Sequence, residues 1–179
     1  MQDYIDFLTR HRFNAVRLPL NSVLVNDNSQ VGTQCGEYNG WATLDVLDDV
    51  LSRLRAAGLF VLLDMHTSVY PEGNTRLWCG GASDSCSAED EAPVKAAWET
   101  LAGRYCSSHP NIIGADLYNE PHGATWGHGE EGVRWDLAAE RLGAAVQRVC
   151  TRWLIVVEGA NGDASSSCAP NGSWWGEVC

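Results

Sequence analysis

The chain has 179 residues with a formal net charge of −11, from 12 Lys and Arg against 23 Asp and Glu, and 45% of its residues are apolar. This composition is that of a globular protein long enough to bury one core. No stretch approaches the roughly 18 uninterrupted apolar residues of a membrane helix, and an acidic surface repels phosphate backbones and anionic lipids, which argues against membrane and nucleic-acid partners.

Cysteine usage indicates the compartment. Seven Cys and eight Trp favour a secreted protein, because in an oxidising compartment thiols pair into disulfides that stabilise the fold. The acidic N-terminus carries no basic segment followed by an apolar run, so we expect no signal peptide within this chain. The Cys count is odd and Cys179 is the last residue, which leads us to expect one partial domain over residues 1–179, truncated at both ends.

In chain order, the apolar pattern predicts a helix, a strand, and then three further pairs of a helix and a strand. Each strand is a nearly continuous apolar run that ends in polar residues, which is typical of buried parallel strands. We place Pro93 in the first turn of the third helix, where proline is tolerated. The predicted helices cover residues 3–11, 43–57, 93–105 and 135–149, and the predicted strands cover 14–20, 59–66, 112–119 and 154–158.

The spacing of the strand ends bounds the size of the whole fold. Arg17, His66, Glu120 and Glu158 lie at or near the ends of the four predicted strands, and three βα units occupy the 141 residues from the first to the last, about 47 each. Eight such units need roughly 380 residues, and even short barrels rarely have fewer than roughly 200. The predicted fold class is therefore α/β, an incomplete (β/α)8 TIM barrel of roughly four βα units.

The sharpest chemical signal is the run from Leu117 to His122, LYNEPH, at the end of the third strand. A Glu at the carboxyl end of a barrel strand lies where substrates bind, and Pro121 stiffens the turn that follows it. Glu120 therefore fits a catalytic acid, and Asn119 fits a hydrogen-bond partner for a sugar hydroxyl. A Glu-Pro turn with no function is the alternative for this motif when it is taken alone.

Two more polar residues occupy equivalent strand ends. Arg17 lies within an apolar strand, where an unpaired charge is costly, so we expect it to reach a carboxylate. His66 ends its strand in a position that suits a hydrogen bond to a sugar or to a carboxylate. Taken alone, either residue fits a structural role equally well, and the company of Glu120 favours the functional one.

Six segments carry a family resemblance in a fixed order: 13–19 (FNAVRLP), 61–66, 111–122, 135–141 (WDLAAER), 154–159 and 174–176 (WWG). In these the chain resembles glycoside hydrolase family 5, the cellulase-type (β/α)8 barrels, and in particular its bacterial and microbial-eukaryote endoglucanases. The resemblance implies strands two to five of eight. It implies that Arg17 and His66 match the family's active-site Arg and His, Asn119 its sugar-binding Asn, and Glu120 its general acid/base.

A second carboxylate is the missing part. Retaining glycoside hydrolysis needs a nucleophilic carboxylate roughly 5 Å from the acid. The family's pattern places this nucleophile on strand seven, which has no counterpart in this chain. By spacing alone Glu158 is a candidate nucleophile, whereas the resemblance makes it a supporting residue. A buried partner for an Arg or a loop amide is the alternative for Glu158. We expect the chain by itself to be inactive.

Aromatic residues fit a glycan ligand, because flat rings stack on the apolar faces of glucose units. Trp78, Trp126, Trp174 and Trp175 lie in loops after strand ends, and we assign them to substrate binding together with His122 and Asn119. Loop packing is the alternative for each of the four Trp. The remaining candidates, Trp98, Trp135 and Trp153, lie on or beside helices and are assigned to the core.

The Cys residues are assigned to disulfides rather than to a metal. Cys79 and Cys86 share one loop, Cys106 and Cys150 end two helices, and Cys168 and Cys179 flank the last loop, which leaves Cys35. The paired short spacings of a zinc site are absent from the sequence, so no metal is expected.

Together these features predict a secreted, retaining endo-β-1,4-glucanase that hydrolyses β-glucan without metal or organic cofactor, in an oligomeric state that the sequence leaves open. Another polysaccharide specificity such as mannanase stays open, because one scaffold changes substrate by loop exchange. A second hypothesis is a non-catalytic glycan-binding remnant.

Overall fold

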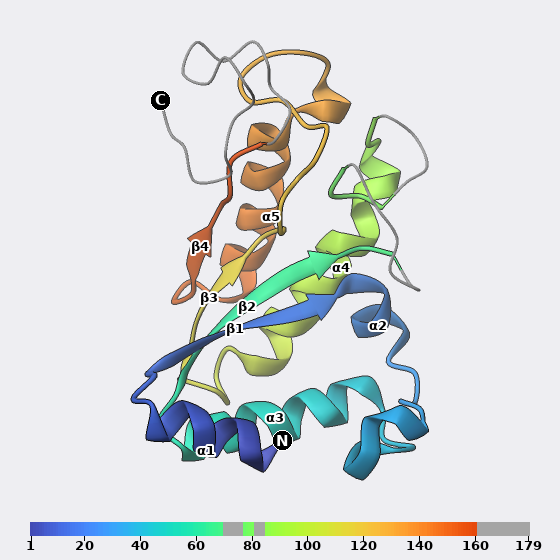
Figure 1. Ribbon diagram of the computed structural model, residues 1–179. Helices are drawn as coiled ribbons and strands as arrows, with labels where there is room; N and C mark the ends of the chain where they lie inside the picture. The colour runs from blue at the N-terminus through green and yellow to red at the C-terminus, as the bar shows by residue number, and fades with distance from the viewer. Residues whose placement is uncertain (70–76, 81–84, 161–179) are drawn as a thin grey trace.

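The computed structural model describes residues 1–69, 77–80 and 85–160 and contains one four-stranded parallel sheet with strand order β1-β2-β3-β4 (Figure 1). Helices precede and follow the strands in the predicted alternation. The elements are α1 (Gln2–Arg10), β1 (Ala15–Asn21), α2 (Ser22–Asp27), η1 (Thr33–Tyr38), α3 (Thr43–Ala56), β2 (Phe60–Thr67), α4 (Ala88–Tyr105), β3 (Ile112–Asp116), η2 (Glu131–Val133), α5 (Trp135–Val149) and β4 (Leu154–Val156).

The core lies between the sheet and the helices on one of its faces. In Figure 1, α4 and α5 lie side by side behind the strands and α3 crosses below them. Val61, Leu63 and Met65 alternate along β2 and are fully buried. On the opposite face, Phe60 and Leu154 are 49% and 65% exposed, so within the described residues that face has no covering layer.

Glycine lets the last two strands and their helix pack closely. A Cβ on Gly114 of β3 would lie 2.5 Å from the Leu154 carbonyl oxygen, so no larger residue fits between β3 and β4. At Gly143 of α5 the packing is less tight, because a Cβ there would lie 3.3 Å from Cγ2 of Ile155 on β4. These two positions set the spacing of the sheet and its helix at β4.

All predicted helices and strands are present, with several corrections. Helix α2 and η1 lie between the first strand and the second predicted helix, where no element was predicted. Strand β4 ends at Val156, two residues before its predicted end. Strand β3 ends at Asp116, three residues before the predicted end, although the Leu117 N–H still donates to the Val156 carbonyl. Pro93 is not in a first turn, because α4 begins at Ala88. A capping box starts the helix there: the Ser87 side chain accepts from the Asp90 N–H, and the Asp90 carboxylate accepts from the Ser87 N–H.

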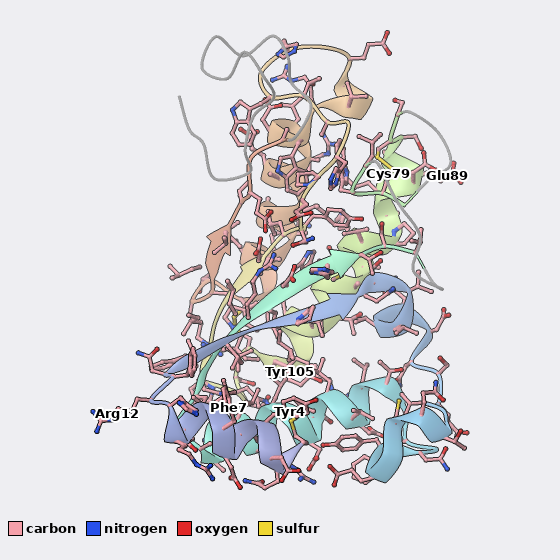
Figure 2. The ribbon with its side chains drawn as sticks, viewed as in Figure 1. Tyr4, Phe7, Arg12, Cys79, Glu89 and Tyr105 are labelled. Atoms are coloured by element: carbon pink, nitrogen blue, oxygen red, sulfur yellow. A yellow bond between two sulfur atoms is a disulfide. The ribbon has the colours of Figure 1, made fainter. Side chains whose placement is uncertain are left out.

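Two of the expected disulfides are present. Cys79–Cys86 closes a loop at the N-terminal end of α4, and Figure 2 shows Cys79 near Glu89 of that helix. Cys106–Cys150 joins the C-terminal ends of α4 and α5. The predicted pair Cys168 and Cys179 lies outside the described residues, and Cys35 is an exposed free thiol. Among the described residues, no helix has the length and apolarity needed to cross a bilayer.

Candidate active site

Arg17 on β1 is the centre of the site. Its guanidinium lies 2.9 Å from Asp64 Oδ2 through Nη1, donates to Asp116 Oδ2 at 2.8 Å through Nε, and reaches Glu158 Oε1 at 2.7 Å through Nη2. The expectation that Arg17 reaches a carboxylate is confirmed, and it reaches three: one on β2, one on β3 and one just after β4. The planar fork of arginine suits this arrangement because its donors point in fixed and separate directions.

Two predicted site residues are held by this cluster. Asn119, three residues after β3, accepts a hydrogen bond from Arg17 Nη2 on Oδ1 at 3.1 Å. His66 on β2 places Nδ1 2.8 Å from Asp64 Oδ2. Because an ionised carboxylate only accepts, Nδ1 carries the hydrogen of this bond and Nε2 is the other ring nitrogen, on a side chain that is 44% exposed.

Glu120 has an unusual backbone conformation. Its φ of 47° lies in the left-handed region, which costs an L-residue other than glycine about 1–2 kcal/mol. The Glu120 N–H donates to Glu158 Oε2 at 3.0 Å, which holds this conformation in place. A strained residue fixed by a carboxylate is typical of functional sites, where the surrounding structure maintains a conformation that the chain alone would leave.

Glu158 connects Glu120 to Arg17. One of its carboxylate oxygens pairs with Arg17 and the other accepts the Glu120 amide, so both have a partner within the cluster. Its backbone carbonyl accepts a hydrogen bond from the Trp135 indole at 2.7 Å. These contacts favour the supporting role that the resemblance implies, with an Arg and a loop amide as partners.

Sequence reasoning missed Asp64 and Asp116, which lie side by side on β2 and β3 and are 0% and 2% exposed. Burial raises the pKa of Asp116 to about 6, against the opposing effect of Arg17. Burial likewise raises the pKa of Asp64, against His66 and Arg17. The sequence does contain a signal for these two residues. Each is a charged residue within an apolar strand, which is the feature that also identified Arg17.

The excess of carboxylates does not amount to a metal centre. Within the described ranges, no group of three or more His, Cys, Asp or Glu side chains has the arrangement that holds a metal ion. The guanidinium of Arg17 occupies the position between Asp64, Asp116 and Glu158 where a cation would bind. The cluster therefore acts through hydrogen bonds and charge.

Comparison with known proteins identifies the family. The family described as Cellulase (glycosyl hydrolase family 5) matches residues 1–176. The chain belongs to glycosyl hydrolase family 5. Its prediction from the sequence motifs is thereby confirmed.

Relatives in the family are bacterial endoglucanases. The chain is 38% identical over 172 residues to the major extracellular endoglucanase of Xanthomonas campestris, covering 92% of this chain and 33% of that protein. It is 32% identical over 181 residues to an endoglucanase of Paenibacillus polymyxa, covering 98% of this chain and 43% of that protein. The chain thus spans less than half the length of these relatives.

Solved structures confirm the fold. The catalytic domain of the Xanthomonas campestris enzyme superposes with a TM-score of 0.76 and 34% identity, over 98% of this chain and 51% of that one. A variant of the Pyrococcus horikoshii endocellulase in complex with cellotetraose gives a TM-score of 0.76 and 31% identity, over 97% and 50%. The four βα units are thus part of the family's TIM barrel, spanning about half of those chains.

The aromatic residues predicted to bind substrate differ in how exposed they are. Trp78 is fully buried, packs against Trp135 and donates its indole N–H to Glu91, so its assignment to sugar stacking is wrong. Glu91 is itself buried and also pairs with Arg141. Trp126 is 50% exposed in the loop after β3, and Trp174 and Trp175 lie outside the described residues.

The other His and Trp residues assigned from the sequence differ in the burial of their side chains. His122 is exposed, in the same loop as Trp126. Trp98, Trp135 and Trp153 are buried in the core, as predicted. The structure therefore gathers Arg17, His66, Asn119 and Glu158 into one cluster, to which the Glu120 backbone is also bonded.

Proposed function

We propose that this chain is the Glu120-bearing part of a retaining endo-β-1,4-glucanase that hydrolyses internal bonds of a β-glucan. The observation that carries the proposal is the network at the carboxyl ends of the strands, in which Arg17 binds Asn119 and Glu158, and Glu158 binds the Glu120 amide. The carboxyl ends of barrel strands are where catalytic residues of this fold lie.

The proposed roles follow from the contacts. Glu120 protonates the leaving oxygen and later activates water, with its backbone fixed by Glu158. Asn119, whose Oδ1 is held by Arg17, presents its amide to the sugar 2-hydroxyl, a bond that strengthens in the transition state. Arg17 and His66 orient the nucleophile.

Turnover requires a second carboxylate that residues 1–179 do not supply in this proposal. Both Glu158 oxygens are already bonded, so the residue supports the acid and does not attack the sugar. We infer that the chain is one partial catalytic domain, inactive by itself. Secretion is supported by two disulfides and by the description of the Xanthomonas campestris relative as extracellular.

Ligand binding tests the substrate class without requiring turnover. Calorimetric titration of the 179-residue chain with cellotetraose should show binding that Asn119→Ala and Trp126→Ala weaken about 10-fold each, while Trp41→Ala serves as a control on another exposed Trp. Mannotetraose should bind less well. Preference for mannotetraose would change the specificity to mannanase, and no binding of either sugar would contradict the proposal.

Turnover is tested by supplying the missing carboxylate. The chain alone should release no reducing ends from carboxymethyl cellulose. Fused to the C-terminal half of the Xanthomonas campestris catalytic domain, it should hydrolyse this substrate, and Glu120→Gln should lower kcat about 10²- to 10⁴-fold. A folded fusion that binds cellotetraose but has no activity would favour the glycan-binding remnant. Activity of the unfused chain that Glu158→Gln abolishes would identify Glu158 as the nucleophile.

A further inference from the structure

The charges around Arg17 do not balance. One guanidinium faces three carboxylates, those of Asp64 on β2, Asp116 on β3 and Glu158 after β4. The other polar groups facing them are His66 on β2 and Asn119 after β3. With His66 neutral and all three acids ionised, the cluster carries two excess negative charges, in a place where Asp64 and Asp116 are almost completely removed from water.

Asp64 and Asp116 also leave two oxygens without partners. Each sends Oδ2 to Arg17, and within the described part of the chain neither Oδ1 has a hydrogen-bond partner or access to solvent. An ionised carboxylate oxygen buried without a donor costs several kcal/mol, and native structures rarely leave one so. Two such oxygens in one cluster call for a donor, and no described side chain provides one to either oxygen.

The two acids are placed to share that donor. Asp64 and Asp116 are register partners on adjacent parallel strands, which run about 4.8 Å apart, and both reach the same guanidinium from the same face of the sheet. A carboxyl group that binds one proton becomes a donor, and its neighbour remains an acceptor. One proton bound by either acid removes one of the two excess charges and leaves one ionised carboxylate fewer in the buried cluster.

We propose that Asp64 and Asp116 form a proton-binding pair, which holds one shared proton in mildly acidic solution and positions Arg17 and, through it, the Glu158 carboxylate that fixes Glu120. The proton belongs to the pair, since two acids this close titrate in coupled steps. The raised pKa values of both acids, with Asp116 at about 6, agree with this geometry. The proposal concerns the folded chain and holds whether or not the chain hydrolyses glucan.

The pair makes stability depend on pH in a defined direction. A carboxyl whose pKa is 3.8 in the unfolded chain and about 6 in the folded one binds more protons when folded between these values. The folding equilibrium constant therefore falls about 30-fold in total as the pH rises from 4 to 6, and changes little from this cause above that range.

A carboxyl NMR titration of the 179-residue chain tests the proposal directly. The side-chain carboxyl carbons of Asp64 and Asp116 should show a shared step near pH 6, and the Glu120 amide resonance should shift with the same midpoint because Glu158 accepts its hydrogen bond. Asp116→Asn puts an N–H donor where the shared proton lies, so it should remove that step and the fall in folding constant between pH 4 and 6.

Asp48→Asn is the matched control, because Asp48 also pairs with an Arg, but its burial is outweighed by the hydrogen bonds from Arg104 and Tyr105 and its pKa is lowered. It should leave the step near pH 6 unchanged. Titration of both Asp64 and Asp116 below pH 4.5 in the wild-type chain would overturn the proposal, even if a variant failed to fold. A step near pH 6 that persists in Asp116→Asn would overturn it as well.

Discussion

Arginine–aspartate pairs occur at both ends of the sheet, and they differ in balance and in burial. Near the amino ends of the strands, Arg104 of α4 pairs with Asp48 of α3, and Tyr105 donates to the same carboxylate at 2.8 Å. Tyr105 is labelled close to α3 in Figure 2. Both charged side chains are more than one third exposed, and these hydrogen bonds, outweighing desolvation, lower the pKa of Asp48.

At the carboxyl ends, the same kind of pair has an excess of acid, and its two Asp side chains are almost completely buried. Arg17 faces three carboxylates, the pKa of Asp116 is raised, and Glu120 is held at positive φ. The amino end is a balanced set of contacts in which Arg152 also donates to the carbonyls of Cys106, His109 and Ile112. Arginine–carboxylate pairs alone therefore do not identify a functional site, whereas an excess of buried carboxylates beside a residue with a strained backbone does.

Removing the central cation should produce the largest effect. Arg17→Met leaves Asp64 and Asp116 buried without their cation, and we expect a loss of about 5 kcal/mol in unfolding free energy at pH 7.5. The loss should be smaller at pH 5, where the two acids accept protons more readily. Urea unfolding at both pH values measures it. An equal loss at both would show that packing, not charge, is what Arg17 provides.

The disulfides extend the comparison to the covalent links at each end. Cys106–Cys150 closes 44 residues near the amino end and Cys79–Cys86 closes 7 near the carboxyl end. In the chain-entropy model, replacing both cysteines by serine should cost about 4 kcal/mol for the first pair and about 2.4 kcal/mol for the second. Thermal unfolding of the two double variants tests the order, and a larger loss for the short loop would show that the Trp78 region depends on its disulfide for packing.

The sequence carried the pattern of the fold and only part of the site. Continuous apolar runs marked all four strands, and the helix predicted over 43–57 ends at Ala56, just before Gly58 with its φ of 74°. Asp64 and Asp116 were missed because each is one polar residue in a run that was classified by its apolar majority. Trp78 was placed with the ligand because burial of its loop depends on Glu91 and Arg141, which are 13 and 63 residues further along the chain. Such contacts between distant residues have no local signature.

The smallest expected effect tests the balanced end of the molecule. Asp48→Asn should lower the unfolding free energy by about 1 kcal/mol at pH 7, since pairs this exposed are screened by solvent. The lowered pKa of Asp48 fixes the sign: its contribution is present above the unfolded value of 3.8 and is lost as the pH falls through the folded one. The variant and the wild-type chain should therefore converge in stability toward pH 3, as measured by urea unfolding. Asp116→Asn should show the opposite trend, with its relative stability rising between pH 4 and 6, so two substitutions of the same type separate the two ends of the sheet by the sign of their pH dependence.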